Sequence, residues 1–145
     1  MKKITFVLTI LFFSTCKSPD IEYTEYKRTV SSGAIEQILN EYKATDDIYS
    51  LLFFKQAFKG EIIQIENCNE IIFSDSLFTQ SGLGLAKVFR INNTCTTKIT
   101  DIEKKYSFRI KTKDASKHKY IYIRKTFLDN NKYKIIFSNS LRGFL

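Results

Sequence analysis

The sequence predicts an α+β fold in which two N-terminal helices pack on a curved, mostly antiparallel sheet of about six to seven strands. Helical periodicity of the apolar residues is confined to the chain before Gly60. From Glu61 onward the period changes to two, and short apolar runs alternate with turn-forming residues. Short connections between such runs favour antiparallel neighbours, with the helices on one face of the sheet.

The first predicted helix has its apolar residues on one face, at positions i, i+3, i+4 and i+7: Ile35, Ile38, Leu39 and Tyr42. A residue of the segment 31–33 can cap its start. Glu36 lies in the first turn, near the positive end of the helix dipole.

The second predicted helix begins at Thr45-Asp46-Asp47, which supplies an N-cap and first-turn carboxylates, and it ends at Gly60. Its apolar residues are Ile48, Leu51, Leu52, Phe54 and Phe58. Because the phenylalanines widen the apolar face, this helix is expected to be the more buried of the two.

The strands are predicted where apolar residues alternate between turn signals: Ile62–Ile65, Ile71–Phe73, Leu85–Ile91, Thr97–Ile102, residues 106–111, Tyr120–Phe127 and Tyr133–Phe137. Asn130 and Asn131 suit the central positions of a tight turn between the last two. The element order loosely resembles the nuclear-transport-factor-2-like arrangement. That resemblance implies a cone-shaped sheet whose open end forms a ligand pocket.

The first sixteen residues have the pattern of an export signal. Lys2 and Lys3 form a short positive head, residues 4–13 carry no charge, and Ser14-Thr15-Cys16 closes the segment. The uncharged run is too short to span a bilayer, because a helix needs about 20 apolar residues to cross a hydrocarbon core about 30 Å thick.

The segment Phe13-Ser14-Thr15-Cys16 resembles a relaxed lipobox of bacterial lipoproteins, with Phe13 at the usual Leu position and Thr15 at the usual Gly, Ala or Ser position. The resemblance implies that the Cys16 thiol receives diacylglycerol and that cleavage leaves Cys16 first in the mature chain. Stable anchoring needs more than one acyl chain, such as palmitate, each buried CH₂ contributing about 0.8 kcal/mol. Cleavage by ordinary signal peptidase and an uncleaved hydrophobic anchor are the alternatives.

Residues 1–15 are therefore predicted to be a signal peptide, residues 16–30 a flexible tether, and residues 31–145 a single domain. The tether contains Pro19, the only proline of the chain. Lys17 follows Cys16 in place of the Asp that favours inner-membrane retention in enteric bacteria. By that analogy we expect the outer membrane of a Gram-negative cell envelope.

Two cysteines remain if Cys16 is acylated. Cys68 and Cys95 both lie among turn-forming residues, and an exported protein is in an oxidising compartment, so we expect them to form a disulfide. Two separate, partly buried thiols are the alternative. Neither cysteine has the neighbouring His or second Cys that a zinc or thiol-redox site needs.

No catalytic motif accompanies these features, and the sequence predicts neither an enzyme nor a bound cofactor or metal. His118 is the only histidine, and Lys117 and Lys119 flank it rather than a carboxylate or nucleophile. We interpret it as a solvated loop histidine. The segment Gly82-Leu83-Gly84 lacks the Lys-Ser/Thr of a phosphate-binding loop and is interpreted as a turn or bulge.

The charge is unevenly distributed: residues 16–100 hold 9 basic and 11 acidic residues, whereas residues 101–145 hold 12 basic and 4 acidic ones. If Ile121 and Ile123 point inward, a cationic patch with aromatic rings is expected on one outer face, formed by Arg109, Lys111, Tyr120, Tyr122 and Arg124. Such rings and cations can bind an anionic ligand, and in an envelope this means lipid headgroups, glycolipids or acidic glycans. A solvated sheet face is the alternative.

The sequence thus predicts a small, membrane-anchored envelope lipoprotein that acts by binding a partner protein or an anionic envelope ligand. Nucleic acid is not an expected partner, because the export segment directs the chain away from the cytoplasm. Two alternatives stay open. One is a carrier or enzyme of the nuclear-transport-factor-2-like type with a pocket, and the other is an immunity-type lipoprotein that neutralises a toxin.

Overall fold

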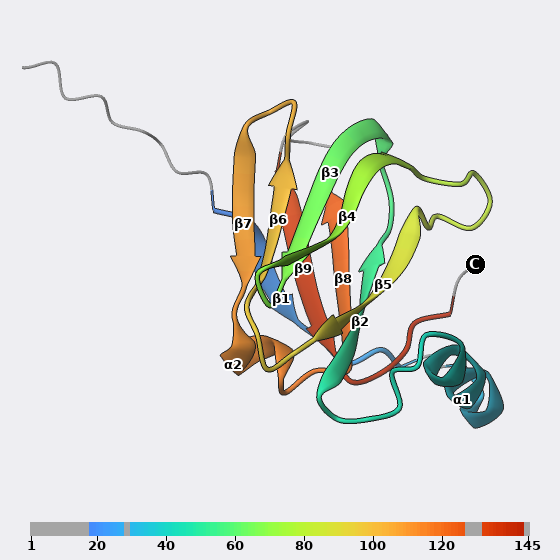
Figure 1. The fold of residues 1–145 in the computed structure, drawn as a ribbon. Helices are drawn as coiled ribbons and strands as arrows, with labels where there is room; N and C mark the ends of the chain where they lie inside the picture. The colour runs from blue at the N-terminus through green and yellow to red at the C-terminus, as the bar shows by residue number, and fades with distance from the viewer. Residues whose placement is uncertain (1–17, 28–29, 127–131, 144–145) are drawn as a thin grey trace, which may run out of the picture.

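The computed structural model describes residues 18–27, 30–126 and 132–143, which form two β-sheets and two helices (Figure 1). In chain order the elements are β1 (Asp20–Tyr23), α1 (Ser32–Glu41), β2 (Tyr49–Phe54), β3 (Lys59–Asn67), β4 (Glu70–Phe78), β5 (Lys87–Asn92), β6 (Thr97–Asp101), β7 (Tyr106–Ile110), α2 (Thr112–Ala115), β8 (Tyr120–Lys125) and β9 (Tyr133–Ser138). The predicted signal peptide (residues 1–15), Cys16 and the Asn130-Asn131 turn lie outside the described residues.

The predicted α+β class, with two N-terminal helices on one sheet, is wrong. The five-stranded sheet has the order β1-β9-β8-β2-β5, with β1 parallel to β9 and β2 parallel to β8. The four-stranded sheet has the order β4-β3-β6-β7 and is antiparallel throughout. Only α1, among the described elements, is a helix of more than about one turn. With this topology the nuclear-transport-factor-2-like order expected from the sequence is also wrong.

The main hydrophobic core lies between the two sheets. The five-stranded sheet contributes Leu52, Phe54, Ile91, Ile121, Ile123, Tyr133, Ile135 and Phe137, and the four-stranded sheet contributes Ile63, Ile65, Leu77, Ile99, Phe108 and Ile110. Each strand sends alternate side chains into this space, which is how two stacked sheets normally form a core.

A second core lies on the outer face of the five-stranded sheet, where α1 covers it (Figure 1). Its buried residues are Ala44, Leu51, Phe53, Val88, Tyr120, Tyr122, Ile136 and Leu141. The stripe predicted for the first helix packs there, since Ile35, Ile38, Leu39 and Tyr42 all contact this cluster. Ser31 caps α1, its hydroxyl accepting a hydrogen bond from the backbone N–H of Ala34 (3.4 Å).

The second predicted helix is replaced by β2. Leu52 and Phe54 point into the core between the sheets, whereas Leu51 and Phe53 point into the second core. A strand buried on both faces is apolar at every position, and such a run cannot be distinguished from a buried helix by periodicity alone. The run Leu51–Phe54 is of this kind, so its apolar spacing fitted a helix by coincidence.

Part of the predicted flexible tether is a strand in the structure. Residues Asp20–Tyr23 form β1, which pairs in parallel with β9. Lys132 forms an ion pair with Asp20 (2.8 Å), and Lys134 forms one with Glu22. The described chain is therefore joined to the sheet from Asp20 onward, eleven residues before the expected start of the domain at residue 31.

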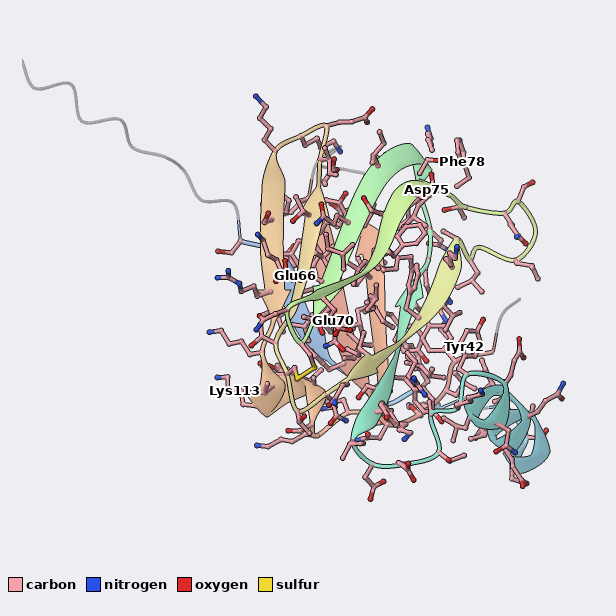
Figure 2. The ribbon with its side chains drawn as sticks, in the orientation of Figure 1. Tyr42, Glu66, Glu70, Asp75, Phe78 and Lys113 are labelled. Carbon is pink, nitrogen blue, oxygen red and sulfur yellow. A yellow bond between two sulfur atoms is a disulfide. The ribbon has the colours of Figure 1, made fainter. Side chains whose placement is uncertain are left out.

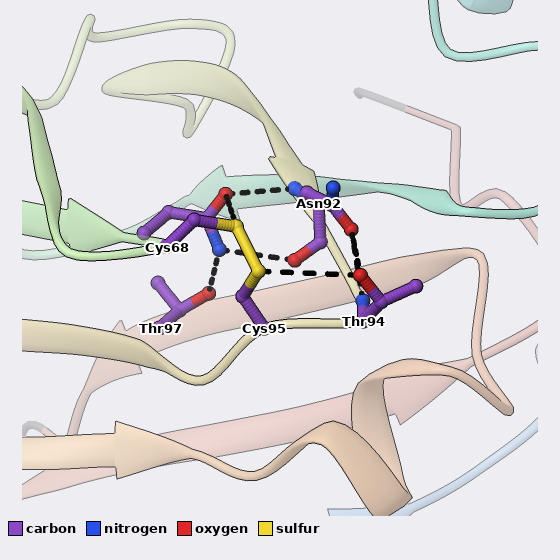
Figure 3. Close-up of a disulfide and its surroundings, with 6 residues drawn as sticks. Cys68, Asn92, Thr94, Cys95 and Thr97 are labelled. Carbon is purple, nitrogen blue, oxygen red and sulfur yellow. Dashed lines mark hydrogen bonds between the residues drawn. A yellow bond between two sulfur atoms is a disulfide. The ribbon is translucent and has the colours of Figure 1, made fainter.

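The expected disulfide between Cys68 and Cys95 is present, with Cα atoms 5.1 Å apart (Figure 3). It joins the β3–β4 turn to the β5–β6 connection, and thereby ties the two sheets together at one end. Asn67 lies beside it and donates hydrogen bonds to the carbonyl of Asn92 and to the hydroxyl of Thr97, both 3.0 Å long. Its side-chain oxygen accepts from the N–H of Asn92 (2.8 Å).

Candidate anion-binding site

The structure does not bring the five residues of the predicted patch together. Arg109 is exposed on β7 in the four-stranded sheet, and Lys111 directly follows that strand as the N-cap of α2. Tyr120 and Tyr122 lie on β8 in the other sheet and are only 3% and 1% exposed. The expected surface rings are therefore wrong, because α1 and the chain near Leu141 cover the face that they occupy.

Arg124, the fifth residue of that set, does lie in a cationic site. We name this site the cation cluster, and it consists of Lys55, Arg124 and Arg142. Lys55 directly follows β2, and its N–H donates to the carbonyl of Ile123 on the neighbouring strand β8 (2.8 Å). Arg124 is the next residue on β8, on the same face of the sheet as Tyr122.

Tyr122 contacts two members of the cation cluster, Lys55 and Arg142. Its hydroxyl accepts a hydrogen bond from the backbone N–H of Arg142 (2.9 Å) and donates one to the carbonyl of Ser140 (3.3 Å). Burial raises the pKa of Tyr122, so the phenol stays protonated at neutral pH. The ammonium of Lys55 lies 5.7 Å from the centre of the Tyr122 ring, and Arg142 packs on the ring of Tyr26 (5.4 Å). The rings therefore hold the cations on one face.

The three charges are of one sign and destabilise one another. Lys55 is 7% exposed, and burial lowers its pKa to about 8, assisted by repulsion from Arg142 and then from Arg124. A lysine with such a pKa is positively charged in most molecules at neutral pH, but at an energetic cost. A bound anion close to all three side chains would relieve this repulsion.

Arg124 carries a buried hydrogen-bond donor that lacks a partner in the described part of the chain. Its Nε is buried and has no hydrogen-bond partner among the described residues. A buried donor without an acceptor costs about 1–3 kcal/mol, and more when the group is charged. Guanidinium N–H groups match the oxygens of phosphate and carboxylate groups, so the missing acceptor is expected to be an anion.

The cation cluster lies at the end of the five-stranded sheet where β1 begins. Arg124 is paired with Lys134 across β8 and β9, and Lys134 is paired with Asp20, the first residue of β1. Lys55 comes directly after the register pair Phe54–Ile123, and so it lies at the same level as Arg124. The start of the described chain and the cation cluster are thus at one end of the sheet.

His118 lies in a different place, at a cavity of about 290 Å³ near the other end of β8. The lining residues are Asp47, Asn93, Ser116, Lys117, His118, Lys119 and Asn139. The imidazole is half-buried between the rings of Tyr23 and Phe137, and its Nδ1 is 2.7 Å from the carbonyl oxygen of Asp114. It is thus packed rather than solvated, and Nδ1 must carry the proton when the ring is neutral.

The polar groups around this cavity bond mainly to backbone. Asn93 donates to the carbonyl of Asp47 (2.8 Å), and the Lys119 ammonium donates to the carbonyl of Asp46 (2.8 Å). Asn139 donates to the carbonyl of Lys117 (2.9 Å). These bonds fix the loops, and they favour a structural role for the residues over a catalytic one.

Comparison with known proteins found no matching family model, no similar curated protein and no similar solved structure. Within the described ranges, no helix is long and apolar enough to cross a membrane. In the same part of the chain, no three His, Cys, Asp or Glu side chains gather in a way that could hold a metal ion. The geometry of the cation cluster is therefore the feature of the molecule that points to a function.

Two members of the cation cluster, Lys55 and Arg142, were not predicted from the sequence. Lys55 ends the apolar run Leu51–Phe54, and a basic residue directly after a strand buried on both faces is a signal that could have been used. Arg142 gives no such signal, because only the folded chain brings it to Tyr122.

Proposed function

We propose that the protein is a lipid-anchored binding protein of a Gram-negative cell envelope, held in the outer membrane through Cys16, and that it acts without catalysis. Its cation cluster binds the phosphate of anionic lipid headgroups in that membrane. The observation that carries the proposal is the buried Nε of Arg124, which has no acceptor among the described residues and lies beside two further cations.

The position of the cation cluster supports a lipid as the ligand. Cys16 precedes Asp20 by four residues, and four residues span at most about 14 Å. A chain acylated at Cys16 would therefore keep the start of β1 close to the membrane surface. Because the cation cluster lies at this end of the sheet, its side chains would be close to the headgroups.

The chemistry of the cation cluster also fits a phosphate. Arg124 offers a buried N–H donor without an acceptor among the described residues, and Lys55 and Arg142 add positive charge beside it. Anionic leaflets attract basic residues with about 1 kcal/mol per Lys or Arg near the surface. Three such residues, together with a few acyl chains, would fix the orientation of the domain on the membrane as well as its attachment.

The headgroup proposal is tested with a chain beginning at Ser18, which keeps every described residue. Its binding to phosphatidylglycerol vesicles is compared with binding to phosphatidylcholine vesicles by co-sedimentation. Arg124→Gln with Arg142→Gln should reduce binding to the anionic vesicles at least about tenfold, because two of about three favourable contacts are lost.

The matched control removes two charges from the other sheet, by Lys98→Gln with Arg109→Gln. These residues are a register pair on β6 and β7. Binding of this variant should stay within about twofold of the parent chain, since only the site near the membrane is expected to matter. Equal losses in both variants would mean non-specific attraction to net charge, and would contradict a site at the cation cluster.

The anchoring proposal has a separate test. Labelled palmitate is supplied to Gram-negative cells that produce the full chain or its Cys16→Ser variant. The full chain should incorporate label and sediment with the outer membrane, and the variant should do neither. An unlabelled full chain would refute the role given to Cys16.

A further inference from the structure

The two outer strands of the four-stranded sheet carry opposite charge. β4 and its surroundings, residues 60–86, contain four acidic residues and no Lys or Arg, although the chain has 23 basic residues in total. At the other edge, residues 104–113 contain β7 and hold five basic residues with no acidic one. The order β4-β3-β6-β7 makes these two strands the edges of one sheet.

The β4 edge is apolar as well as acidic. Ile71, Ile72 and Phe78 are 60%, 40% and 62% exposed, and Ile62 on β3 adds to the same hairpin. Figure 2 shows Glu70, Asp75 and Phe78 following β4, with Glu66 before the turn. An outer strand also leaves backbone N–H and C=O groups without a partner in the sheet, and such an edge readily accepts another strand.

The charges on both edges are free to meet a partner. Glu70 and Asp75 on β4 take part in no ion pair recorded among the described residues, and neither does Arg109 on β7 or Lys111 after it. All four side chains are exposed. Figure 2 shows Lys113, which belongs to the basic stretch, on the opposite side of the view from Asp75.

The directions of β4 and β7 allow the two edges to pair between two copies of the protein. The sheet has four strands, all antiparallel, so β4 and β7 run in opposite directions. A second copy placed beside the first, in the same orientation, therefore presents its β7 antiparallel to β4. The edge of one copy that carries Glu70 and Asp75 then lies along the edge of the other that carries Arg109 and Lys111, and the β-bulge of β4 between Ile71 and Phe73 separates the pairing into two short stretches.

We propose that the β4 edge of one copy binds the β7 edge of a second copy, so that the four-stranded sheet continues from molecule to molecule. Main-chain hydrogen bonds and the exposed isoleucines supply the attraction, and the opposite charges select this pair of edges. The contact joins two different surfaces, so it repeats and produces rings or linear arrays rather than closed dimers. The inference does not depend on lipid binding by the cation cluster.

The proposal is tested by sedimentation velocity of the full chain in a non-ionic detergent, over a range of protein concentrations. One variant reverses the acidic edge (Glu70→Lys with Asp75→Lys), and another reverses the basic edge (Arg109→Glu with Lys111→Glu). A matched control reverses two exposed acidic residues of α1, by Glu36→Lys with Glu41→Lys. Circular dichroism checks that each variant keeps its strands.

The wild type and the control should form larger species as the concentration rises. Each edge variant alone brings charges of the same sign together at the contact, and it should need at least about tenfold more protein to associate. A mixture of the two edge variants restores opposite charges at every contact, and should associate as the wild type does. A wild type that stays monomeric at all concentrations, or a mixture that stays monomeric while the wild type associates, would overturn the proposal.

Discussion

Removal of the disulfide by Cys68→Ala with Cys95→Ala should strongly destabilise the protein without changing its fold. The two cysteines are 27 residues apart in sequence, and their bond restricts the unfolded chain to a closed loop of that length. In the chain-entropy model, such a loop corresponds to about 3.5 kcal/mol at 25 °C. With an unfolding entropy of about 2.1 cal/mol/K per residue and about 130 residues in the mature chain, Tm should fall by about 13 °C.

The native contacts around the bond are expected to survive its removal. Asn67 still bridges the two loops through its hydrogen bonds to Asn92 and Thr97. The disulfide acts mainly on the unfolded chain, whereas Asn67 acts on the native one, so the two effects should add. Asn67→Ala alone should cost about 2 kcal/mol, because it leaves the N–H of the half-buried Asn92 without its acceptor.

Urea unfolding followed by circular dichroism measures both effects, since the chain contains no tryptophan for fluorescence. The four proteins are the wild type, the double cysteine variant, Asn67→Ala and the combination. Free energies of unfolding that add to within about 0.5 kcal/mol agree with this reasoning. A loss below about 1 kcal/mol for the double cysteine variant would refute it, because an unrestricted unfolded chain must be more disordered.

Three further predictions concern buried polar groups. Burial and two neighbouring guanidinium groups lower the pKa of Lys55 to about 8 from 10.5, so the unfolded chain binds the extra proton and the free energy of unfolding should rise between pH 8 and 10.5. Lys55→Met should remove that rise, and an unchanged pH profile would contradict the assignment. Tyr133→Phe should cost about 2 kcal/mol in urea unfolding, because it removes the 2.6 Å hydrogen bond to the fully buried carboxylate of Asp101. A loss under about 0.5 kcal/mol would argue against that bond. Burial raises the pKa of Glu61, but hydrogen bonds from Lys125 and a backbone N–H lower it more, so its stabilisation exists above the unfolded pKa and is lost as the pH falls. Glu61→Gln should therefore be less sensitive to acid than the wild type in thermal unfolding, and equal sensitivity would contradict this.

Most strands after Gly60 could be predicted because one of their faces is polar. β6 and β7 alternate buried and less buried residues, so a period of two is visible in the sequence. α1 was predicted for the equivalent reason, since its apolar residues occupy one stripe and the rest face water. The signal comes from solvent, which allows polar residues on the exposed side of an element.

β2 and β1 could not be predicted on this basis. β2 has apolar neighbours on both faces, so nothing in its sequence repeats with a period of two. β1 is an outer strand of four residues with two exposed apolar side chains, Ile21 and Tyr23, and its pairing depends on β9, more than 100 residues away. A strand of this kind exists only because a partner is present.

The predicted disulfide and the predicted surface patch differ in the same way. Cys68 and Cys95 could be paired from the sequence because the expected compartment and the turn-forming neighbours both pointed to a bond. The prediction that Arg109, Lys111 and the two tyrosines of β8 share one surface was wrong. The sequence does not show which sheet a strand joins or what covers the face of that sheet.

The sequence by itself determined the disulfide partners and the places where most strands begin, because turn-forming residues and alternating apolar residues are visible over short stretches of the chain. Only the tertiary structure decided that the strands divide into two sheets, that Tyr120 and Tyr122 are buried in the second core, and that Lys55, Arg124 and Arg142 meet. Burial and electrostatic repulsion act through space between segments far apart in the chain, so local sequence patterns do not reveal them.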